Sequence, residues 1–352
     1  MSTYKHPPLP VSGYIRIATL QAGNFQDDIV ISIEPAEFSE EVVPQYEALS
    51  YVTRNLAVAL RHLRSPVGQG RVLWIDAICI DQANDDEKGV QVALMGEIFK
   101  RAWRVVAWLG PQENDSDHAM DCMLHLGSDR CPTLADRDVN LPWSARELTA
   151  VYHLLCRTWF ERLWIRQEVF LANPQAIIKC GSREVLWTVF RTAWLAVFRK
   201  PSIYFGLDKE FYNRLEFLRW FIYHPQSTIR LMELRDLNDN AFCVDPRDRV
   251  YGVLAMLGPA DKALGITPDY SRTMKELYED VATRWTIQHA PLNIILHCEF
   301  QEGQRPSSVP DWSTPLRSSM PPDTFASSQL QAWFQVTESR VLRVAWVSTS
   351  SV

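Results

Sequence analysis

Four polar residues stand at the ends of two short apolar runs, where the side chains of a sheet protein can take part in chemistry. Ser50 and Tyr51 lie near the end of the run YEALSYV, and Asp81 and Gln82 follow the run LWIDAICI. If both runs are parallel strands of one sheet, these residues share its carboxyl edge, where open α/β sheets bind ligands. Their hydroxyl, carboxylate and amide groups could hold a polar molecule, so all four are candidate ligand-binding residues.

Asp76 is a fifth candidate because it interrupts the apolar run of residues 73–80. A carboxylate inside an apolar segment is costly unless it is hydrogen-bonded or used in chemistry. Asp76 could line a cleft at the carboxyl edge, or it could hold a loop amide or a helix N-terminus. The other candidates have structural alternatives too: Asp81 and Gln82 could cap the following helix, and the two hydroxyls could be satisfied in a turn.

Other kinds of site find no support in the sequence. Cys79 has no histidine near it in the chain, so we expect a buried structural thiol and not a nucleophile. The eight histidines and seven cysteines lack the H-E-x-x-H, H-x-x-H and C-x-x-C spacings, so no metal site is expected. The pair Gly68 and Gly70 precedes a strand instead of following one, and no P-loop or G-x-S-x-G motif occurs.

The segment from Leu73 to Gly110 predicts a strand, a helix and a second strand in direct succession. Residues 73–80 form one apolar run, and residues 104–109 form another that ends at a Gly-Pro pair. Between them, from about Asp86, apolar residues recur on one helical face, with acidic residues in the first turn. This order predicts a βαβ unit with parallel strands and a right-handed crossover, and therefore an α/β fold.

Further elements are expected on either side of this unit. The segment before Pro44 alternates apolar and polar positions and predicts a β-hairpin or two edge strands that pack onto the main sheet. Other patterns predict a strand at Tyr46–Val52, a helix capped by Asn55, a helix near His118–Leu126, a helix begun by the capping box of Ser144 and Glu147, a helix at Trp159–Phe170, a hairpin of Gln175–Cys180 and Val185–Val189, and a helix from the turn at Asp245 to Leu257.

Composition limits the classes of partner. A chain of 352 residues with 47% apolar residues can bury a large core and suggests about two domains. The net charge of -6 is mild and the basic residues are scattered, which argues against nucleic-acid partners. No run of about 18 apolar residues predicts a membrane span. The odd, widely spaced cysteines are typical of free thiols in a reducing compartment, so we expect a cytoplasmic protein.

Several separated motifs, in one order, resemble the heterokaryon incompatibility (HET) domain of filamentous fungi. They are YEALSYV, LWIDAICIDQ, VVAWLG and RLWIRQE, and the flanking IRIATLQ, DPRDRVYGVLAML and VPDWS extend the resemblance over most of the chain. The resemblance implies nonself recognition and programmed cell death, with protein partners of such a pathway and self-association into a homo-oligomer as candidates. The chain divides accordingly into a β extension (1–43), a HET domain (44–190), a mainly helical region (191–300) and a Pro- and Ser-rich, partly disordered tail (301–352).

The HET domain is in turn similar to TIR domains in the order of its elements, which implies a TIR-like parallel sheet flanked by helices. Some TIR domains cleave NAD with a glutamate on a helix after the central strands, and Glu168 in RLWIRQE matches that position. The resemblance therefore makes Glu168 a candidate catalytic residue and NAD a candidate substrate, with no cofactor required. Trp164, one helical turn earlier, could stack on a base or nicotinamide ring. Alternatively, Glu168 pairs with Arg162 or Arg166, and Trp164 belongs to the core.

The sequence departs from the HET pattern at two places. Val52 runs directly into Thr53, Arg54 and Asn55, where the family normally has Trp-Gly and a further strand-and-turn stretch. The pattern is also lost after Ala345, as a truncation or a mispredicted exon would produce. These departures leave a third alternative, that of a degenerate member of the family which folds without signalling.

Overall fold

Four parallel strands form the centre of a seven-stranded sheet in the computed structural model of this chain. The structure describes residues 6–10, 13–52, 55–128, 141, 143–199, 209–219, 230–231, 241–288, 309–312, 330–336 and 342–348. The chain divides into two compact units, Met1–Ser227 and Thr228–Val352. The sheet belongs to the first unit.

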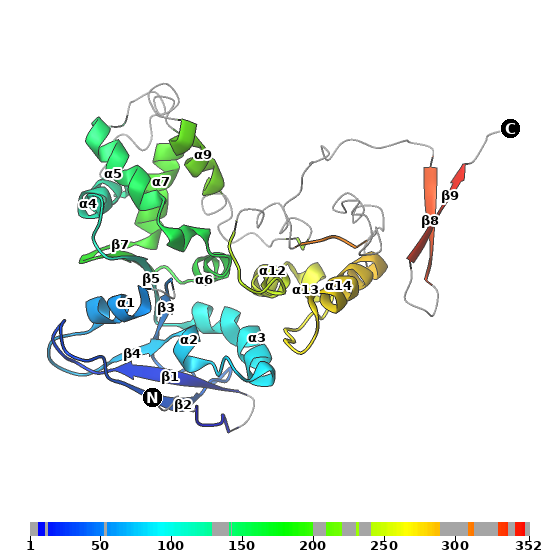
Figure 1. The fold of residues 1–352 in the computed structure, drawn as a ribbon, viewed down its shortest axis with the longest axis horizontal. Coiled ribbons are helices and arrows are strands. Elements are labelled where there is room, and N and C mark those ends of the chain that lie inside the picture. Colours follow the sequence, from blue (N-terminus) through cyan, green and yellow to red (C-terminus); the bar gives the residue numbers. More distant parts are fainter. Residues whose placement is uncertain are drawn as a thin grey trace. The chain divides into compact units, whose positions relative to one another are not determined.

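The first unit holds the seven strands of the sheet and most of the helices described (Figure 1). Its strands are β1 (Tyr14–Leu20), β2 (Ile31–Glu37), β3 (Glu47–Ser50), β4 (Arg71–Trp74), β5 (Arg104–Gly110), β6 (Ile177–Cys180) and β7 (Arg183–Leu186). Its helices are α1 (Leu56–Leu63), α2 (Asp76–Cys79), α3 (Asp85–Arg101), α4 (Ser116–Gly127), α5 (Ala145–Leu155), η3 (Thr158–Glu161), α6 (Ile165–Phe170), α7 (Trp187–Arg199) and α9 (Lys209–Phe217).

The strand order is β2-β1-β4-β3-β5-β6-β7. The predicted parallel pairing holds for β4, β3, β5 and β6. Antiparallel strands complete both edges: the N-terminal hairpin β1–β2 pairs with β4, and β7 returns beside β6. The sheet as a whole is therefore mixed and not parallel throughout. The sequence predicts both edge hairpins, but the second predicted strand, Val185–Val189, is wrong at its end because helix α7 begins at Trp187.

The two faces of the sheet are covered by different helices. One face, with Leu49 and Leu73, packs in a cluster with Leu60 of α1. The opposite face carries Trp74, whose ring meets that of Phe99 in α3 edge-on, with centroids 5.7 Å apart. Because side chains alternate along a strand, α1 and α3 must lie on opposite faces. The chain passes from β3 through α1 to β4 on one side, and then through α3 to β5 on the other, so the strand order reverses at β3.

The predicted strand at residues 73–80 is wrong beyond its first residues. Strand β4 ends at Trp74, and the chain then forms the short helix α2, which begins at Asp76. The amide of Ala77 donates to Oδ1 of Asp76 at 2.7 Å. Trp74, Ile75, Cys79 and Ile80 are buried, so buried apolar residues continue from the strand through the helix, and the periodicity of the run cannot show where the strand ends.

The predicted helix at Trp159–Phe170 is also wrong in part, because it is divided into η3 and α6. The break falls at Arg162, whose backbone is extended with ψ of 139°. Its guanidinium donates to the backbone oxygen of Tyr51, so a contact with the sheet holds the chain at this break. A long-range contact of this kind overrides local helix propensity. The predicted single helix from Asp245 to Leu257 is likewise divided, into α12 (Asp248–Tyr251) and η4 (Leu254–Met256).

Glu47 ties the three central strands together at their amino ends. It lies on β3 opposite Leu73 of β4 and Arg104 of β5. Nε and Nη2 of Arg71 donate to its two oxygens, the latter at 3.0 Å, and Nε of Arg104 donates to Oε1. Glu47 is 7% exposed, so this charge is desolvated and depends on its two partners.

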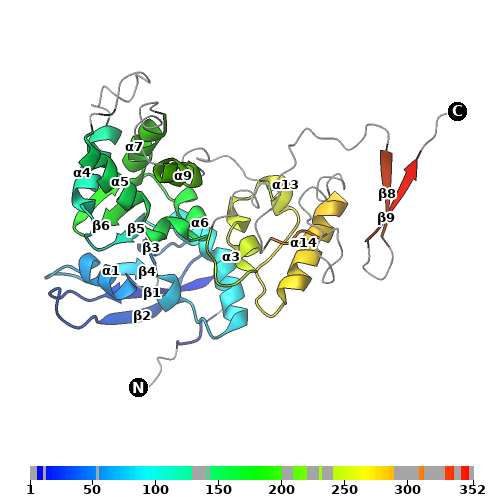
Figure 2. The same cartoon turned by 45° about the horizontal axis from the view of Figure 1, so that its top comes forward.

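The second unit is built around the turn at Asp245. Figure 2 shows the helices of this unit from a second direction. Arg247 pairs with Asp245 and donates from Nη1 to the backbone oxygens of Tyr270 and Arg272. Tyr278 of helix α14 (Met274–Gln288) donates to the oxygen of Pro246 at 2.7 Å. The unit also contains α13 (Pro259–Lys262) and an antiparallel hairpin of β8 (Leu330–Val336) and β9 (Leu342–Ser348). Residues 313–329, in the predicted Pro- and Ser-rich tail, lie outside the described residues.

No helix within the described ranges is both long and apolar enough to cross a membrane.

We predict that Glu47→Ala lowers the free energy of unfolding by about 2–4 kcal/mol, because it leaves two half-buried arginines without their shared anion. Urea denaturation followed by tryptophan fluorescence would measure the change. The control is Glu97→Ala, since Glu97 is an exposed residue paired with Lys100 on α3 and its loss should cost at most about 0.5 kcal/mol. Equal effects of the two substitutions would contradict this account of Glu47.

Candidate functional site

The carboxyl ends of β3 and β4 bring four of the predicted residues into one region. Ser50 ends β3, Tyr51 follows it, and Asp76 follows the end of β4. Glu168 arrives from α6, which packs against α3 and β5. This edge is also where the strand order reverses, and open α/β sheets bind ligands at such a point.

Ser50 and Tyr51 point to opposite faces of the sheet and make different contacts. Tyr51 donates its hydroxyl to Oδ1 of Asp76 at 2.8 Å, so the ends of β3 and β4 are joined by a charge-assisted hydrogen bond. Burial, together with the charge of Asp76, raises the pKa of Tyr51 well above its ordinary value, so the phenol remains a donor. Ser50 accepts a hydrogen bond from Nε1 of Trp159 at 2.8 Å.

Glu168 is the least well satisfied acid of the described residues at this edge. It is 2% exposed, and its Oε2 is buried without a hydrogen-bond partner among the described residues. Burial raises the pKa of Glu168 to about 7. The charge of Arg162 and the nearby hydroxyl of Ser50 lower this pKa, and the charge of Asp76 raises it further. Glu168 can therefore exchange a proton near neutral pH, as a general acid or base must.

Arg162 is the cation whose charge acts on Glu168. Its guanidinium lies over the ring of Tyr51, 5.8 Å from the centroid, and donates to the oxygen of the same residue. Its charge lowers the pKa of Glu168, although no ion pair within 4.0 Å joins the two side chains among the described residues. The alternative of a pair between Glu168 and Arg166 stays a prediction. Sequence reasoning proposed Arg162 only as an ion-pair partner and missed its contact with the strand end, although it stands in the same RLWIRQE motif as Glu168.

The sequence does not mark Trp159 as a site residue, because it predicts this tryptophan as the first residue of a continuous helix, Trp159–Phe170. Its ring is fully buried and meets that of Phe160 edge-on, at 5.0 Å between centroids. Only its indole nitrogen reaches the site, through the hydrogen bond to Ser50. Nothing in the local sequence distinguishes such a tryptophan from one that belongs to the core alone.

The remaining predicted residues divide between this edge and another region. Trp164 stands at the start of α6, half-buried, and its backbone oxygen accepts from the amide of Glu168 at 3.1 Å. Gln82 is exposed and donates from Nε2 to the backbone oxygen of Asp76 at 3.1 Å. Asp81 faces a separate cavity with His6, whose Nδ1 is 3.9 Å from its Oδ1. Asn84, and not Asp81, caps α3 by accepting from the amide of Glu87.

Cys79 has the environment of a structural thiol. It is fully buried, and burial raises its pKa to about 12, so it is not a thiolate at neutral pH. In the part of the chain that the structure describes, no three His, Cys, Asp or Glu residues are grouped so as to hold a metal ion.

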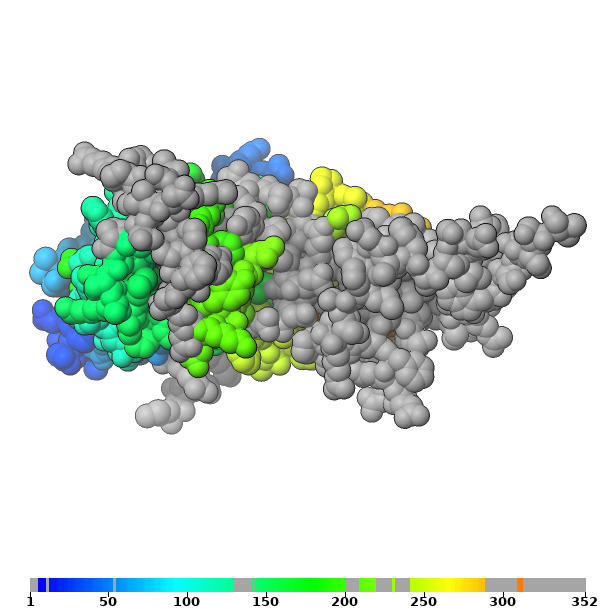
Figure 3. All heavy atoms as spheres, turned by 90° about the horizontal axis from the view of Figure 1, so that it is seen from above, coloured from blue at the N-terminus to red at the C-terminus, as the bar shows by residue number. Residues whose placement is uncertain are grey.

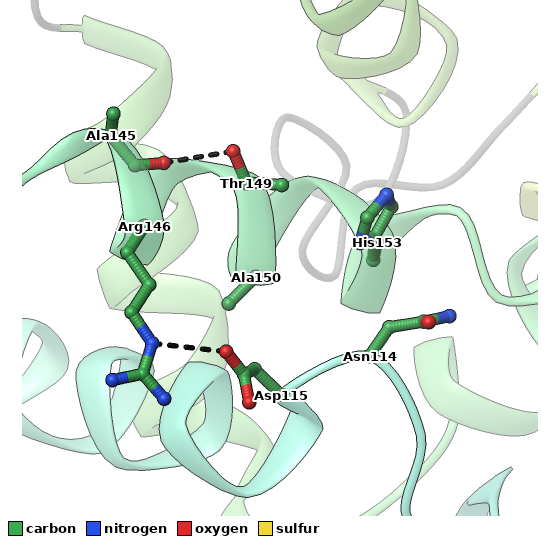
Figure 4. A pocket seen from close by; sticks show the side chains of 7 residues that line it. All are labelled: Asn114, Asp115, Ala145, Arg146, Thr149, Ala150 and His153. Carbon is green, nitrogen blue, oxygen red and sulfur yellow. Dashed lines mark hydrogen bonds and ion pairs between the residues drawn. The ribbon is translucent and has the colours of Figure 1, made fainter.

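A hollow of about 640 Å³ lies apart from the predicted residues, between one face of α5 and the loop before α4 (Figure 4). Arg146 pairs there with Asp115 at 3.0 Å, and His153 stands further along the helix. Asn114 and Asp115 both have left-handed backbones, with φ of 52° and 57°. The turquoise and green side chains of this part of the first unit lie on the face that Figure 3 shows. Because this hollow is open and its Arg146–Asp115 ion pair is satisfied, it offers no chemistry comparable to that of Glu168.

The fold and the site define an α/β protein with a buried glutamate at the carboxyl edge of a mixed sheet. Residues 29–168 match the family model of heterokaryon incompatibility protein (HET). The match extends from the end of the loop before β2 to Glu168 itself, so this part of the chain is similar to the heterokaryon incompatibility family.

A curated relative is similar to the chain over a longer stretch. The chain is 29% identical, over 400 aligned residues, to heterokaryon incompatibility protein 6, OR allele, of Neurospora crassa. The alignment covers 86% of this chain and 58% of the relative, so the chain spans somewhat more than half the length of that protein. No solved structure matches the chain.

The raised pKa of Glu168 predicts how stability depends on pH. Its folded pKa of about 7 lies above the unfolded value of 4.5, so the folded state binds the proton more tightly. The stability contributed by the protonated form is complete below about pH 4.5 and is lost as the pH rises through about 7. Glu168→Gln replaces the ionisable group by a neutral one, so the variant does not lose this stability as the pH rises. We expect the stability of the variant relative to wild type to be about 3 kcal/mol greater at pH 8 than at pH 4.5, in urea denaturation at both values. A difference that does not change with pH would contradict the assignment.

Proposed function

We propose that this chain acts in heterokaryon incompatibility, through nonself recognition that leads to programmed cell death. The observation that carries the proposal is the HET family match over residues 29–168, which covers the core of the sheet and ends at the buried glutamate. The name of the Neurospora crassa relative, which aligns with most of this chain, supports the same role. The partners of the chain would be proteins of an incompatibility or cell-death pathway, and a second copy of the chain is a candidate among them.

The cytoplasm is the compartment that we propose for this activity. Five cysteines within the described residues are free thiols: Cys79, Cys122, Cys156, Cys180 and Cys243. Free, partly buried thiols are typical of proteins that work in a reducing compartment. Signalling after the fusion of hyphae would take place where the two cytoplasms mix.

We predict that inducible expression of the chain in a filamentous fungus arrests hyphal growth and causes cell death. Vital-dye uptake and colony growth would measure the effect against a frame-shifted control with the same transcript. A second strain would express the chain with a Trp-Gly strand-and-turn stretch restored after Val52. The two residues that follow this place, Thr53 and Arg54, lie outside the described residues. Death only in the second strain would identify this chain as a degenerate copy. Survival of both strains, with the proteins present on a blot, would contradict the proposed function.

A second candidate function is NAD glycohydrolase activity of a TIR-like HET domain. It is favoured by one observation: at the edge where β3, β4 and β5 end, Oε2 of Glu168 is buried and has no hydrogen-bond partner in the described part of the chain. Parallel strands with helices on both faces support the TIR-like arrangement, as does the place of this glutamate after the central strands. A carboxylate oxygen with no hydrogen bond is suited to accept one from a ribose hydroxyl of bound NAD.

The chemistry would be hydrolysis at the bond between ribose and nicotinamide. The C1′–N bond breaks with its electron pair going to the nicotinamide nitrogen, which leaves an oxocarbenium-like ribose that the ionised Glu168 stabilises. Water then forms the new bond to C1′ and loses its proton to Glu168, which yields ADP-ribose and nicotinamide. A pKa of about 7 lets Glu168 be ionised for the first step and accept the proton in the second. Trp164 would stack on the nicotinamide ring or on the adenine base.

We predict that purified protein releases nicotinamide from NAD, and that Glu168→Gln lowers kcat at least about 100-fold because it removes the charge that stabilises the transition state. Chromatography of the products would measure the rate. The matched control is Glu161→Gln, which changes a glutamate of the preceding η3 helix that pairs with Arg214 at 3.0 Å. This control should keep most of the activity. No release at high protein concentration, or equal losses in the two variants, would remove the enzymatic function.

A further inference from the structure

A second cavity of the first unit, of about 530 Å³, is lined by acidic groups that the proposed functions do not use. It lies between the N-terminal segment, the start of β1 and the first turns of α3. Leu9, Tyr14 and Val90 supply apolar wall, and Asp81 and Asp86 supply carboxylates. Its volume falls in the range of sites that hold small molecules or single side chains.

The negative charge of this cavity is only partly compensated by the protein. Arg16, which is fully buried, pairs with both oxygens of Glu87, and this hydrogen bonding holds the pKa of Glu87 below its usual value. The remaining contacts of Arg16 go to the backbone oxygens of Cys79 and Pro7, so its charge is already satisfied within the fold. Asp86 forms no ion pair among the described residues.

Asp81 adds a second carboxylate, and its contacts are weak. Its Oδ1 accepts from the amide of Ala83 at 3.1 Å and lies 3.9 Å from Nδ1 of the His6 ring. With His6 neutral, Asp81 and Asp86 give the cavity a formal charge of about -2, since Arg16 and Glu87 cancel. A cationic ligand is therefore favoured.

Gln91 provides an independent observation. It lines the cavity and is 1% exposed, and it donates from Nε2 to the backbone oxygen of Tyr14 at 3.0 Å. Its Oε1 is buried and has no hydrogen-bond partner within the described residues. A buried acceptor left unpaired costs free energy, which a ligand carrying N–H donors would recover.

The groups that line the cavity indicate which kind of cation fits it. The carboxylates are not grouped as metal ligands anywhere in the described part of the chain. A guanidinium has several N–H donors in one plane, which suits two carboxylates and an amide oxygen better than the compact ammonium of a lysine. The apolar wall of Leu9, Tyr14 and Val90 can cover its aliphatic stem. We propose that this cavity binds a guanidinium group, carried by an arginine side chain of a partner protein or by a free small molecule.

Calorimetric titration of the full chain tests the proposal. The probes are a capped Gly-Arg-Gly tripeptide, the same tripeptide with citrulline, which is neutral and of the same shape, and agmatine as a free guanidinium. We expect the arginine tripeptide to bind at least about tenfold more tightly than the citrulline tripeptide, since a charged hydrogen-bonded contact is worth more than about 1.4 kcal/mol. If agmatine binds and the arginine tripeptide does not, the site takes a free small molecule, and an arginine of a partner protein is ruled out as the source of the guanidinium.

Two variants of α3 provide a matched pair. Asp86→Asn and Asp85→Asn remove the same charge from the same helix turn, but only Asp86 lines the cavity. Both residues are exposed, so both variants should fold. Asp86→Asn should weaken binding of the arginine tripeptide about tenfold, and Asp85→Asn less than about twofold. Equal effects of the two variants, or equal affinities for the arginine and citrulline tripeptides, would overturn the proposal.

Discussion

The shared ion pair of Glu47 with Arg71 and Arg104 fixes the register on which the rest of the first unit depends. One carboxylate on β3 holds the neighbouring strands on both sides, and it lies only three residues before Ser50. A slip of one residue in either pairing would move every side chain to the other face of the sheet. Ser50 would then exchange faces with Leu49 and Tyr51, and the edge that receives Glu168 would be lost.

Burial of Glu168 opposes the stability that this register provides. A carboxyl group with one unpaired oxygen is costly inside a protein, and a hydrophobic or neutral side chain would pack there at less cost. Proteins keep such costly groups chiefly where function requires them. The neighbours of Glu168 are arranged to moderate the cost without cancelling it, because Arg162 is engaged with Tyr51 and Ser50 also accepts from Trp159.

The short helix α2 separates two acidic regions that are adjacent in sequence. Asp76, at its start, joins Tyr51 at the carboxyl edge, whereas Asp81, two residues beyond its end, faces the cavity near His6. The Arg16–Glu87 pair holds this separation, since Arg16 also binds the backbone oxygen of Cys79 and Glu87 also binds the amide of Asp81. One segment of the chain thereby contributes to two sites of different chemistry.

The sequence by itself determined the α/β class, the helix and strand that follow Asp81, both edge hairpins and the match of RLWIRQE to the HET family, because hydrophobic periodicity, capping residues and motifs are local signals. It could not show that β4 stops at Trp74 or that the chain breaks at Arg162, since both depend on contacts with Tyr51, far away in the sequence. Only the tertiary structure shows that Asp81 lies apart from Glu168, Ser50 and Asp76, because burial and charge at a site come from residues that meet through folding.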